Sequence, residues 1–176
     1  MWYDKITFLF KNKELRNKVL FILGLFVVFR IAANIPIPGV GAENLRRFFA
    51  ENQAFGLLNI FSGGTLSNFS IVLLGLGPYI TATIILQLLT VVIPALERLS
   101  KEGESGRRKI TQYTRYSTVG LSLLQGFFIS VGLEQIQAPS GNSVVFQPGW
   151  GFRLMTMITL SSGTAFIMWL GEQITE

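Results

Sequence analysis

The sequence contains no cysteine and no histidine, and Asp4 is its single aspartate. The absence of cysteine excludes a disulfide framework and any metal site built from thiolates. Intramembrane hydrolases use paired aspartates, a serine with a base, or a metal held by histidine and carboxylate. These arrangements lack their essential groups here, because Asp4 lies outside the apolar segments and those segments contain no acidic residue. We therefore do not expect an enzyme, and we expect no cofactor and no metal.

Charged residues are also scarce, at 14% of the chain, whereas aromatic residues make up 12% and the mean hydropathy is +0.47. A chain of 176 residues could form one soluble domain, but this composition carries more apolar surface than such a domain can bury. We therefore predict a membrane protein. The net charge of +5 comes from basic residues that are not gathered on one soluble face, so we do not expect nucleic-acid binding.

The longest uncharged stretch runs from Asn52 to Leu96, a length of 45 positions. A spanning helix needs about 20 apolar residues, so the stretch is too long for one span. Its second half is nearly pure apolar, but its first half is polar and contains Asn59, Ser62, Gly63, Gly64, Thr65, Ser67, Asn68 and Ser70. Irregular backbone at membrane depth occurs only where protein buries it or where it lines a watery cavity. We therefore predict a half-inserted segment at 55–70 and a span at 76–93, which is typical of a pore.

The predicted span begins at a Gly-Leu-Gly-Pro sequence, residues 75–78. Glycine allows close approach of neighbouring backbone, and proline suits the first turn of a helix. From there one helical face carries Leu76, Ile80, Ile84 and Gln87. Two interpretations are open: a stripe that packs inside a helix bundle, which the spacing alone favours, or a face that lines a pore or gate.

The N-terminal part contains a basic segment and then an apolar run. Residues 1–18 combine five basic side chains with apolar residues at helical spacing, which predicts an amphipathic helix on the membrane surface. A signal peptide is the alternative, but the apolar run is long and no small-residue cleavage site follows it. We predict the first span at 19–35. Arg30 within it is a functional candidate by default, although reaching to the interface from near the helix end is the interpretation we favour.

Beyond the uncharged stretch, residues 97–115 form a hydrophilic connection with basic residues that include Arg107, Arg108 and Lys109. The sequence GESGRRK lacks the GxxxxGK[ST] spacing of a phosphate-binding loop, so we exclude nucleotide binding. We predict further spans at 116–133 and 154–171, the last rich in small residues that favour close helix packing. Between them we expect an exposed, hairpin-like loop at 134–153.

The distribution of basic residues predicts the orientation in the membrane. Eleven of the 15 lysines and arginines lie in the N-terminal segment and in residues 97–115, whereas Arg46, Arg47 and Arg153 lie on the other side. Cytoplasmic segments carry an excess of Lys and Arg. We therefore predict an all-α, polytopic membrane protein with a single membrane domain over residues 1–176, four spans, and both termini in the cytoplasm.

Two other functions fit parts of this pattern. A small-solute secondary transporter also uses broken helices and Gly/Pro interruptions to build a binding site at the membrane midplane. Such a site favours ionisable or densely polar groups near the centre of the spans, whereas this stretch combines neutral polar residues with bulky aliphatic ones. A non-conducting structural subunit is the other alternative, but it does not explain the Gly-Gly and Gly-Leu-Gly-Pro breaks.

Three long motifs occur in order: IPIPGV, then FSGGTLSNFSIVLLGLGPYITATIILQLLTVV, then KEGESGRRKITQYTRY. Shorter landmarks extend from ELR at Glu14–Arg16 to WLGEQITE at Trp169–Glu176. In these features the sequence resembles the SecY family, the large subunit of the bacterial protein-conducting channel (the Sec translocon). Proteins of that family are about twice as long and have ten spans, and the resemblance covers the first four.

The resemblance implies roles for particular residues. Phe55–Ser70 matches the plug that closes the pore from outside, centred on Phe61, Ser62, Gly63, Gly64, Thr65 and Leu66. Leu76 and Ile80 match two positions of the apolar pore ring, and the lateral-gate wall is matched by Thr83, Ile84 and Gln87. Arg107, Arg108 and Lys109 match a contact for a cytoplasmic partner.

The resemblance also implies function, partners and location. Secretory preproteins would cross, and membrane proteins would enter, the bacterial cytoplasmic membrane through the channel to which this multi-pass chain contributes. The implied partners are SecE- and SecG-like small subunits, the motor ATPase SecA, the ribosome, signal sequences with their preproteins, and membrane lipid. The energy for transport would come from the motor or from translation.

Overall fold

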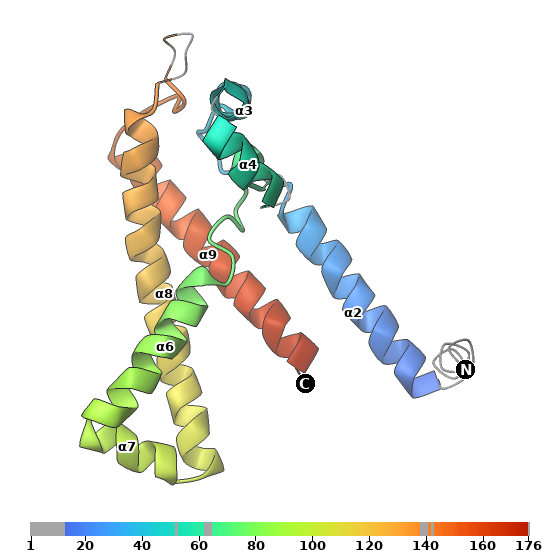
Figure 1. The fold of residues 1–176 in the computed structure, drawn as a ribbon, viewed down its shortest axis with the longest axis vertical. Coiled ribbons are helices and arrows are strands. Elements are labelled where there is room, and N and C mark those ends of the chain that lie inside the picture. Colours follow the sequence, from blue (N-terminus) through green and yellow to red (C-terminus); the bar gives the residue numbers. More distant parts are fainter. Residues whose placement is uncertain (1–12, 52, 62–64, 138–140, 142, 176) are drawn as a thin grey trace.

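The computed structural model describes residues 13–51, 53–61, 65–137, 141 and 143–175 of the chain. The surface helix predicted at 1–18 falls outside the described residues as far as residue 12. In the described part the regular structure is helical, which confirms the all-α prediction. The helices are α2 (Lys13–Ala32), α3 (Ala42–Glu51), α4 (Gln53–Phe61), α5 (Thr65–Asn68), α6 (Gly77–Val92), α7 (Pro94–Lys101), α8 (Glu104–Gln135) and α9 (Trp150–Thr175) (Figure 1).

Two prolines determine where α6 begins and ends. Pro78 lies in the first turn of α6, as predicted, where its missing N–H removes no helical hydrogen bond. At the other end Ile93 is extended, with φ −100° and ψ 112°, because Pro94 disfavours helical backbone in the residue before it. Helix α7 then starts at Pro94, and the chain bends by 103° from α6 to α7.

Helices α8 and α9 pack closely through small side chains. On α8 the buried residues follow each other at intervals of four: Thr114, Thr118, Ser122, Gly126 and Ser130. Ser122 Oγ and Ser161 Oγ of α9 lie 3.0 Å apart in a hydrogen bond. A methyl group added at Gly126 would lie 3.1 Å from the Cα atom of Met157 on α9. Small residues allow two helix backbones to approach in this way, and van der Waals contact then stabilises the pair.

The largest apolar core lies at one end of the molecule and includes part of the connection between α8 and α9. Its buried members are Ile37, Val40, Leu45, Phe69, Leu133, Val144, Val145, Phe152 and Leu160. Val144 is fully buried, and its carbonyl accepts a hydrogen bond of 2.8 Å from the backbone N–H of Gly41. The expectation that residues 134–153 form an exposed loop is therefore wrong at Val144 and Val145, which pack under the segment between α2 and α3.

Within the described residues, α8 and α9 are each long and apolar enough to cross a membrane. Helix α6 has 16 residues, about 24 Å at 1.5 Å per residue, and reaches the required length only together with α7. Helix α2 has 20 residues but carries charged side chains in its first turns and Arg30 in its last. The chain is thus an all-helical membrane protein, and a count of four spans remains a prediction.

The ends of the long helices lie in two groups, at opposite ends of the molecule. The start of α2, helix α7 and the end of α9 lie in the lower half of Figure 1, and α3 and the α8–α9 connection lie at its top. Helix α2 stands apart along most of its length, and only Leu25 and Ala32 of it are buried. The start of α2, helix α7 and the end of α9 therefore lie toward the same end of the molecule, and their side of the membrane stays a prediction.

Candidate functional site

The turns before α6 place its first residues beside α9. Residues 71–76 form consecutive turns, in which Gly75 has a φ of +55° that a residue with a side chain rarely adopts. The backbone of Ile71 and Val72 lies directly on Gly163 of α9, and a methyl group added at Gly163 would overlap the carbonyl of Ile71. The absence of a side chain at Gly163 therefore lets this turn, and α6 after it, sit against α9.

Helix α6 has one buried face and one exposed face. Pro78, Ala82 and Leu86 are buried, and α6 packs on α8. The predicted stripe lies on the other face, where 42% of Leu76 and 54% of Ile80 are exposed, and Ile84 and Gln87 are exposed as well. The prediction of a helix is correct here. The stripe is not buried within the described chain, although Leu76 borders a cavity beside α9, and both interpretations of the stripe stay open.

A polar cleft of about 330 Å³ lies between α6, α7 and α8. It brings together two predicted gate residues, Thr83 and Gln87, and one predicted contact residue, Arg107. Hydroxyl groups supply most of the remaining polar lining, from Tyr79, Thr90, Ser100, Thr111 and Thr114. Thr83 Oγ1 donates a hydrogen bond of 2.8 Å to the carbonyl of Tyr79. The hydroxyl proton of Thr83 is therefore not available to a group in the cleft.

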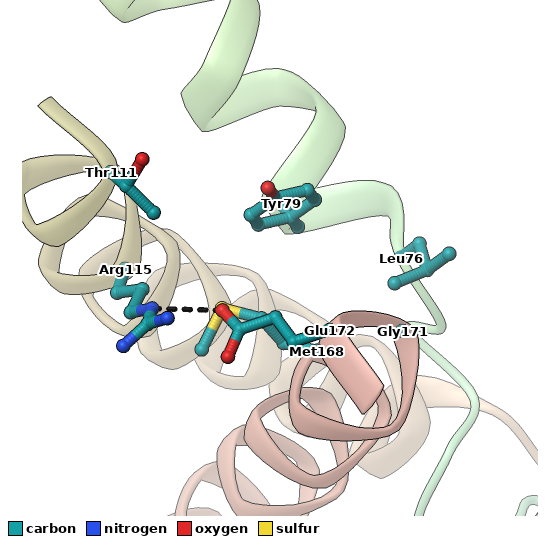
Figure 2. A pocket seen from close by; sticks show the side chains of 7 residues that line it. All are labelled: Leu76, Tyr79, Thr111, Arg115, Met168, Gly171 and Glu172. Atoms are coloured by element: carbon teal, nitrogen blue, oxygen red, sulfur yellow. Dashed lines mark ion pairs between the residues drawn. The ribbon is translucent and has the colours of Figure 1, made fainter. Parts of the chain in front are cut away.

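A second cavity, of about 380 Å³, lies next to Leu76 and Tyr79 and between α8 and α9 (Figure 2). An ion pair crosses it, with Arg115 Nε 2.8 Å from Glu172 Oε1. This oxygen of Glu172 is buried and, apart from the ion pair, has no hydrogen-bond partner among the described residues. Sequence reasoning missed this pair, because nothing in one sequence connects a residue of α8 with one near the end of α9.

The predicted plug segment contains α4 and α5. Helix α4 has a largely exposed apolar surface that includes Leu57, Leu58 and Ile60, and 88% of Phe61 is exposed. Ser62, Gly63 and Gly64 lie outside the described residues. Thr65 and Leu66 begin α5, and Leu66 is half-buried. Helical residues therefore lie on both sides of residues 62–64, and the half-inserted segment stays a prediction.

The plug segment is joined at its C-terminal end to the connection between α2 and α3. The N–H of Ile37 donates to the carbonyl of Phe69 over 3.0 Å, and the N–H of Ile71 donates to the carbonyl of Ile35 over 3.0 Å. Ser70 between them is fully buried. Arg46 Nη2 of α3 also donates to Asn68 Oδ1 over 2.6 Å, a contact that sequence reasoning did not find.

The predicted contact residues Arg107, Arg108 and Lys109 lie exposed in the first turns of α8. Helix α7 before them is also charged, and Lys101 Nζ donates a hydrogen bond of 2.6 Å to Glu97 Oε1. This bond, together with the positive charge of Lys101, lowers the pKa of the Glu97 carboxyl group below its ordinary value. Gly106 packs on the backbone of Leu99, which keeps α7 and α8 close together. The basic residues thus project from a tight helical corner.

Arg30 is exposed and lies in the last turn of α2, two residues before the helix ends at Ala32. That position fits a side chain that reaches to the membrane interface, and the role stays a prediction. No three histidine, cysteine, aspartate or glutamate residues of the described chain lie together as a metal site. The site combines an exposed aliphatic face, helical turns on both sides of residues 62–64, and two cavities whose polar lining includes Arg107 and the Arg115–Glu172 ion pair.

The comparisons with known proteins agree in one family. The model of the SecY family matches residues 70–176. The protein translocase subunit SecY of Escherichia coli K12 is 48% identical over 165 residues, which are 93% of this chain and 37% of that protein. Proteins of the same name from Buchnera aphidicola and Aquifex aeolicus are 48% and 46% identical, and the match covers 46% and 40% of their lengths. The chain spans about two fifths of the length of these curated relatives.

Proposed function

Because this chain belongs to the SecY family, we propose that it forms part of the pore, plug and lateral gate of a protein-conducting channel. Secretory preproteins would cross the bacterial cytoplasmic membrane through this channel, and membrane proteins would enter the membrane from it. The observation that carries the proposal is the exposed aliphatic face of α6, which begins at Leu76 and directly follows the broken segment α4–α5.

Leu76 and Ile80 suit an apolar pore ring for a physical reason. They lie one helical turn apart on an exposed face, so both can point into the same opening. Aliphatic side chains offer ions no polar partners and expel water from a narrow constriction, which closes the channel to ions. The same side chains can move aside for a passing polypeptide, because they form no hydrogen bonds or ion pairs with it.

The segment at residues 55–70 is proposed as the plug, and α6 as one wall of the lateral gate. An exposed apolar helix such as α4 can lie on an apolar ring from outside, while its backbone attachment at residues 69–71 keeps it close to the pore. Thr83, Ile84 and Gln87 follow the ring on α6, where a signal sequence would pass from the pore to lipid. The polar lining beside them accommodates the hydrated part of that chain.

The exposed cluster Arg107, Arg108 and Lys109 is proposed as a contact for the motor ATPase SecA or the ribosome. SecE- and SecG-like subunits are proposed as membrane partners. The orientation follows from the basic residues, with both termini and residues 97–115 in the cytoplasm. The chain has no cysteine, so single cysteines at Ser105 and Ser140 test the orientation with an impermeant maleimide in intact cells. Labelling at Ser140 alone is expected, and labelling at Ser105 alone would contradict the orientation.

A photo-crosslinking residue at Ile80 tests conduction directly. It is placed in a full-length SecY-family protein that carries this sequence, and a preprotein is arrested halfway through the reconstituted channel. Leu124 on α8 provides the control, because it is apolar and 55% exposed, against 54% for Ile80. The crosslinker at position 80 is expected to attach to the arrested chain, and the one at position 124 is not. Equal crosslinking at both positions, or crosslinking at position 124 alone, would contradict a pore-facing α6.

A further inference from the structure

The plug segment lies against α3, which packs on both α4 and α5. Arg46 of α3 reaches across to Asn68, the last residue of α5, and its Nη2 atom lies 2.6 Å from Asn68 Oδ1. A hydrogen bond from a charged guanidinium group is stronger than one between two neutral groups. The side chain of Arg46 therefore ties the final turn of the plug segment to a helix that does not belong to it.

The residues after Asn68 form a firmly held attachment point. Phe69 accepts the hydrogen bond from Ile37 and is buried, although its φ of +45° is uncommon for an aromatic residue. Such a backbone conformation persists only where the surrounding structure holds it in place. The attachment at residues 69–71 is thus part of the folded core, and it gives the plug segment a fixed end.

Helix α4, earlier in the segment, is held less firmly than this attachment. Leu57, Leu58, Ile60 and Phe61 of α4 are all exposed, so burial within the described chain does little to keep α4 in place. The Arg46–Asn68 bond lies between this loosely packed part and the fixed attachment. A movement of the plug segment that carries α5 away from α3 has to break this bond.

We propose that Arg46 is a positioning residue that holds the plug segment in its closed position through Asn68, an inference that rests on the proposed function. The bond exists in the closed arrangement and is lost when α5 moves away from α3. A contact present in only one of two states shifts the equilibrium toward that state. The strength of the Arg46–Asn68 bond therefore sets how often the closed channel opens without a substrate.

The test measures ion leak through single channels of a full-length SecY-family protein that carries this sequence, reconstituted in a planar bilayer with its partner subunits. The variant R46A is expected to raise the open fraction about two- to fivefold, which corresponds to the loss of one exposed hydrogen bond to a charged group. The variant R47A is the matched control. It removes the same charge from the next position, but Arg47 pairs with Glu43 inside α3, over 3.5 Å.

Two further variants separate positioning from a general loss of structure. The variant N68D replaces the hydrogen bond with an ion pair and is expected to lower the open fraction below that of the unmodified protein. The variant R46K keeps the charge but loses the planar donor group, so it is expected to lie between R46A and the unmodified protein. N68D also decides the question if R46A fails to assemble, because aspartate has nearly the shape of asparagine and keeps the Oδ1 atom that accepts from Arg46.

Equal leak in R46A and R47A, or a raised leak in N68D, would overturn the role of Arg46. The double variant L76N/I80N in the same bilayer distinguishes this failure from that of the proposed function. A leak that rises in L76N/I80N but not in R46A removes only the inference about Arg46. No rise in L76N/I80N removes the ring itself, and with it the basis of the inference.

Discussion

The α8–α9 pair and the exposed face of α6 use apolar helices in opposite ways. In the pair, small residues of α8 such as Ser122 and Gly126 pack against α9, and both residues are buried. At the start of α6, the bulky residues Leu76 and Ile80 are exposed to 42% and 54%. Helix packing in a membrane relies on small side chains, whereas sealing a pore requires large ones.

The difference assigns separate tasks to the two regions. The α8–α9 pair is a scaffold, which also carries the turn at Ile71 and Val72 on Gly163 and so determines where α6 starts. Leu76 and Ile80 leave about half of their surface outside that scaffold. Substitutions in the pair should therefore change stability, and substitutions on the face should change conduction while stability stays near its original value.

The largest expected effect on stability is at Gly163. In G163A the added methyl group overlaps the carbonyl of Ile71, and the turn has to move away from α9. Because the clash is with backbone and not with a flexible side chain, we expect a loss of about 3 kcal/mol in the free energy of unfolding. The control G120A places the same methyl group on α8, where no atom lies within 4 Å.

Thermal unfolding in detergent measures both variants. G120A is expected to match the original protein or to exceed it by up to about 1 kcal/mol, since alanine is the better helix former. If G163A were as stable as G120A, the turn would not depend on α9, and the scaffold would have to be redefined.

A smaller effect is expected at the end of the same pair where α8 connects to α9. Arg153 of α9 binds Glu134 of α8 through Nε and Nη2, at 3.0 and 2.7 Å, and its guanidinium group lies 5.4 Å from the centre of the Trp150 ring. R153A leaves Glu134 with the backbone N–H of Gly149 as its remaining hydrogen-bond donor. We expect a loss of about 1–2 kcal/mol, measured as above. R47A, whose ion pair is exposed, should lose no more than about 0.5 kcal/mol.

The helical part of this fold could be predicted because its signals are local. Pro78 in the first turn of α6 and the face from Leu76 to Gln87 depend on residues within a few turns of each other. The burial of Val144 and Val145 could not be predicted, because two apolar residues in a segment with Gly and Pro show no period. Their burial depends on the chain between α2 and α3, about a hundred residues earlier.

The candidate site divides in the same way. Its aliphatic face followed from spacing, and the role of that face followed from a resemblance. The contacts that join separate helices, Arg46 with Asn68 and Arg115 with Glu172, left no sign in the sequence. Each partner is an ordinary polar residue on its own helix, and only the packing of the helices brings the two together.

The most direct test of the account compares two double variants of the full-length protein, L76N/I80N on α6 and L124N/F128N on α8. Both replace exposed apolar residues one turn apart, so their direct effects on stability should be similar and small. Single-channel leak and thermal stability are measured on the same preparation. The account predicts a leak that rises in L76N/I80N and not in L124N/F128N, with similar unfolding temperatures. A stable L76N/I80N channel with the leak of the original protein would contradict it.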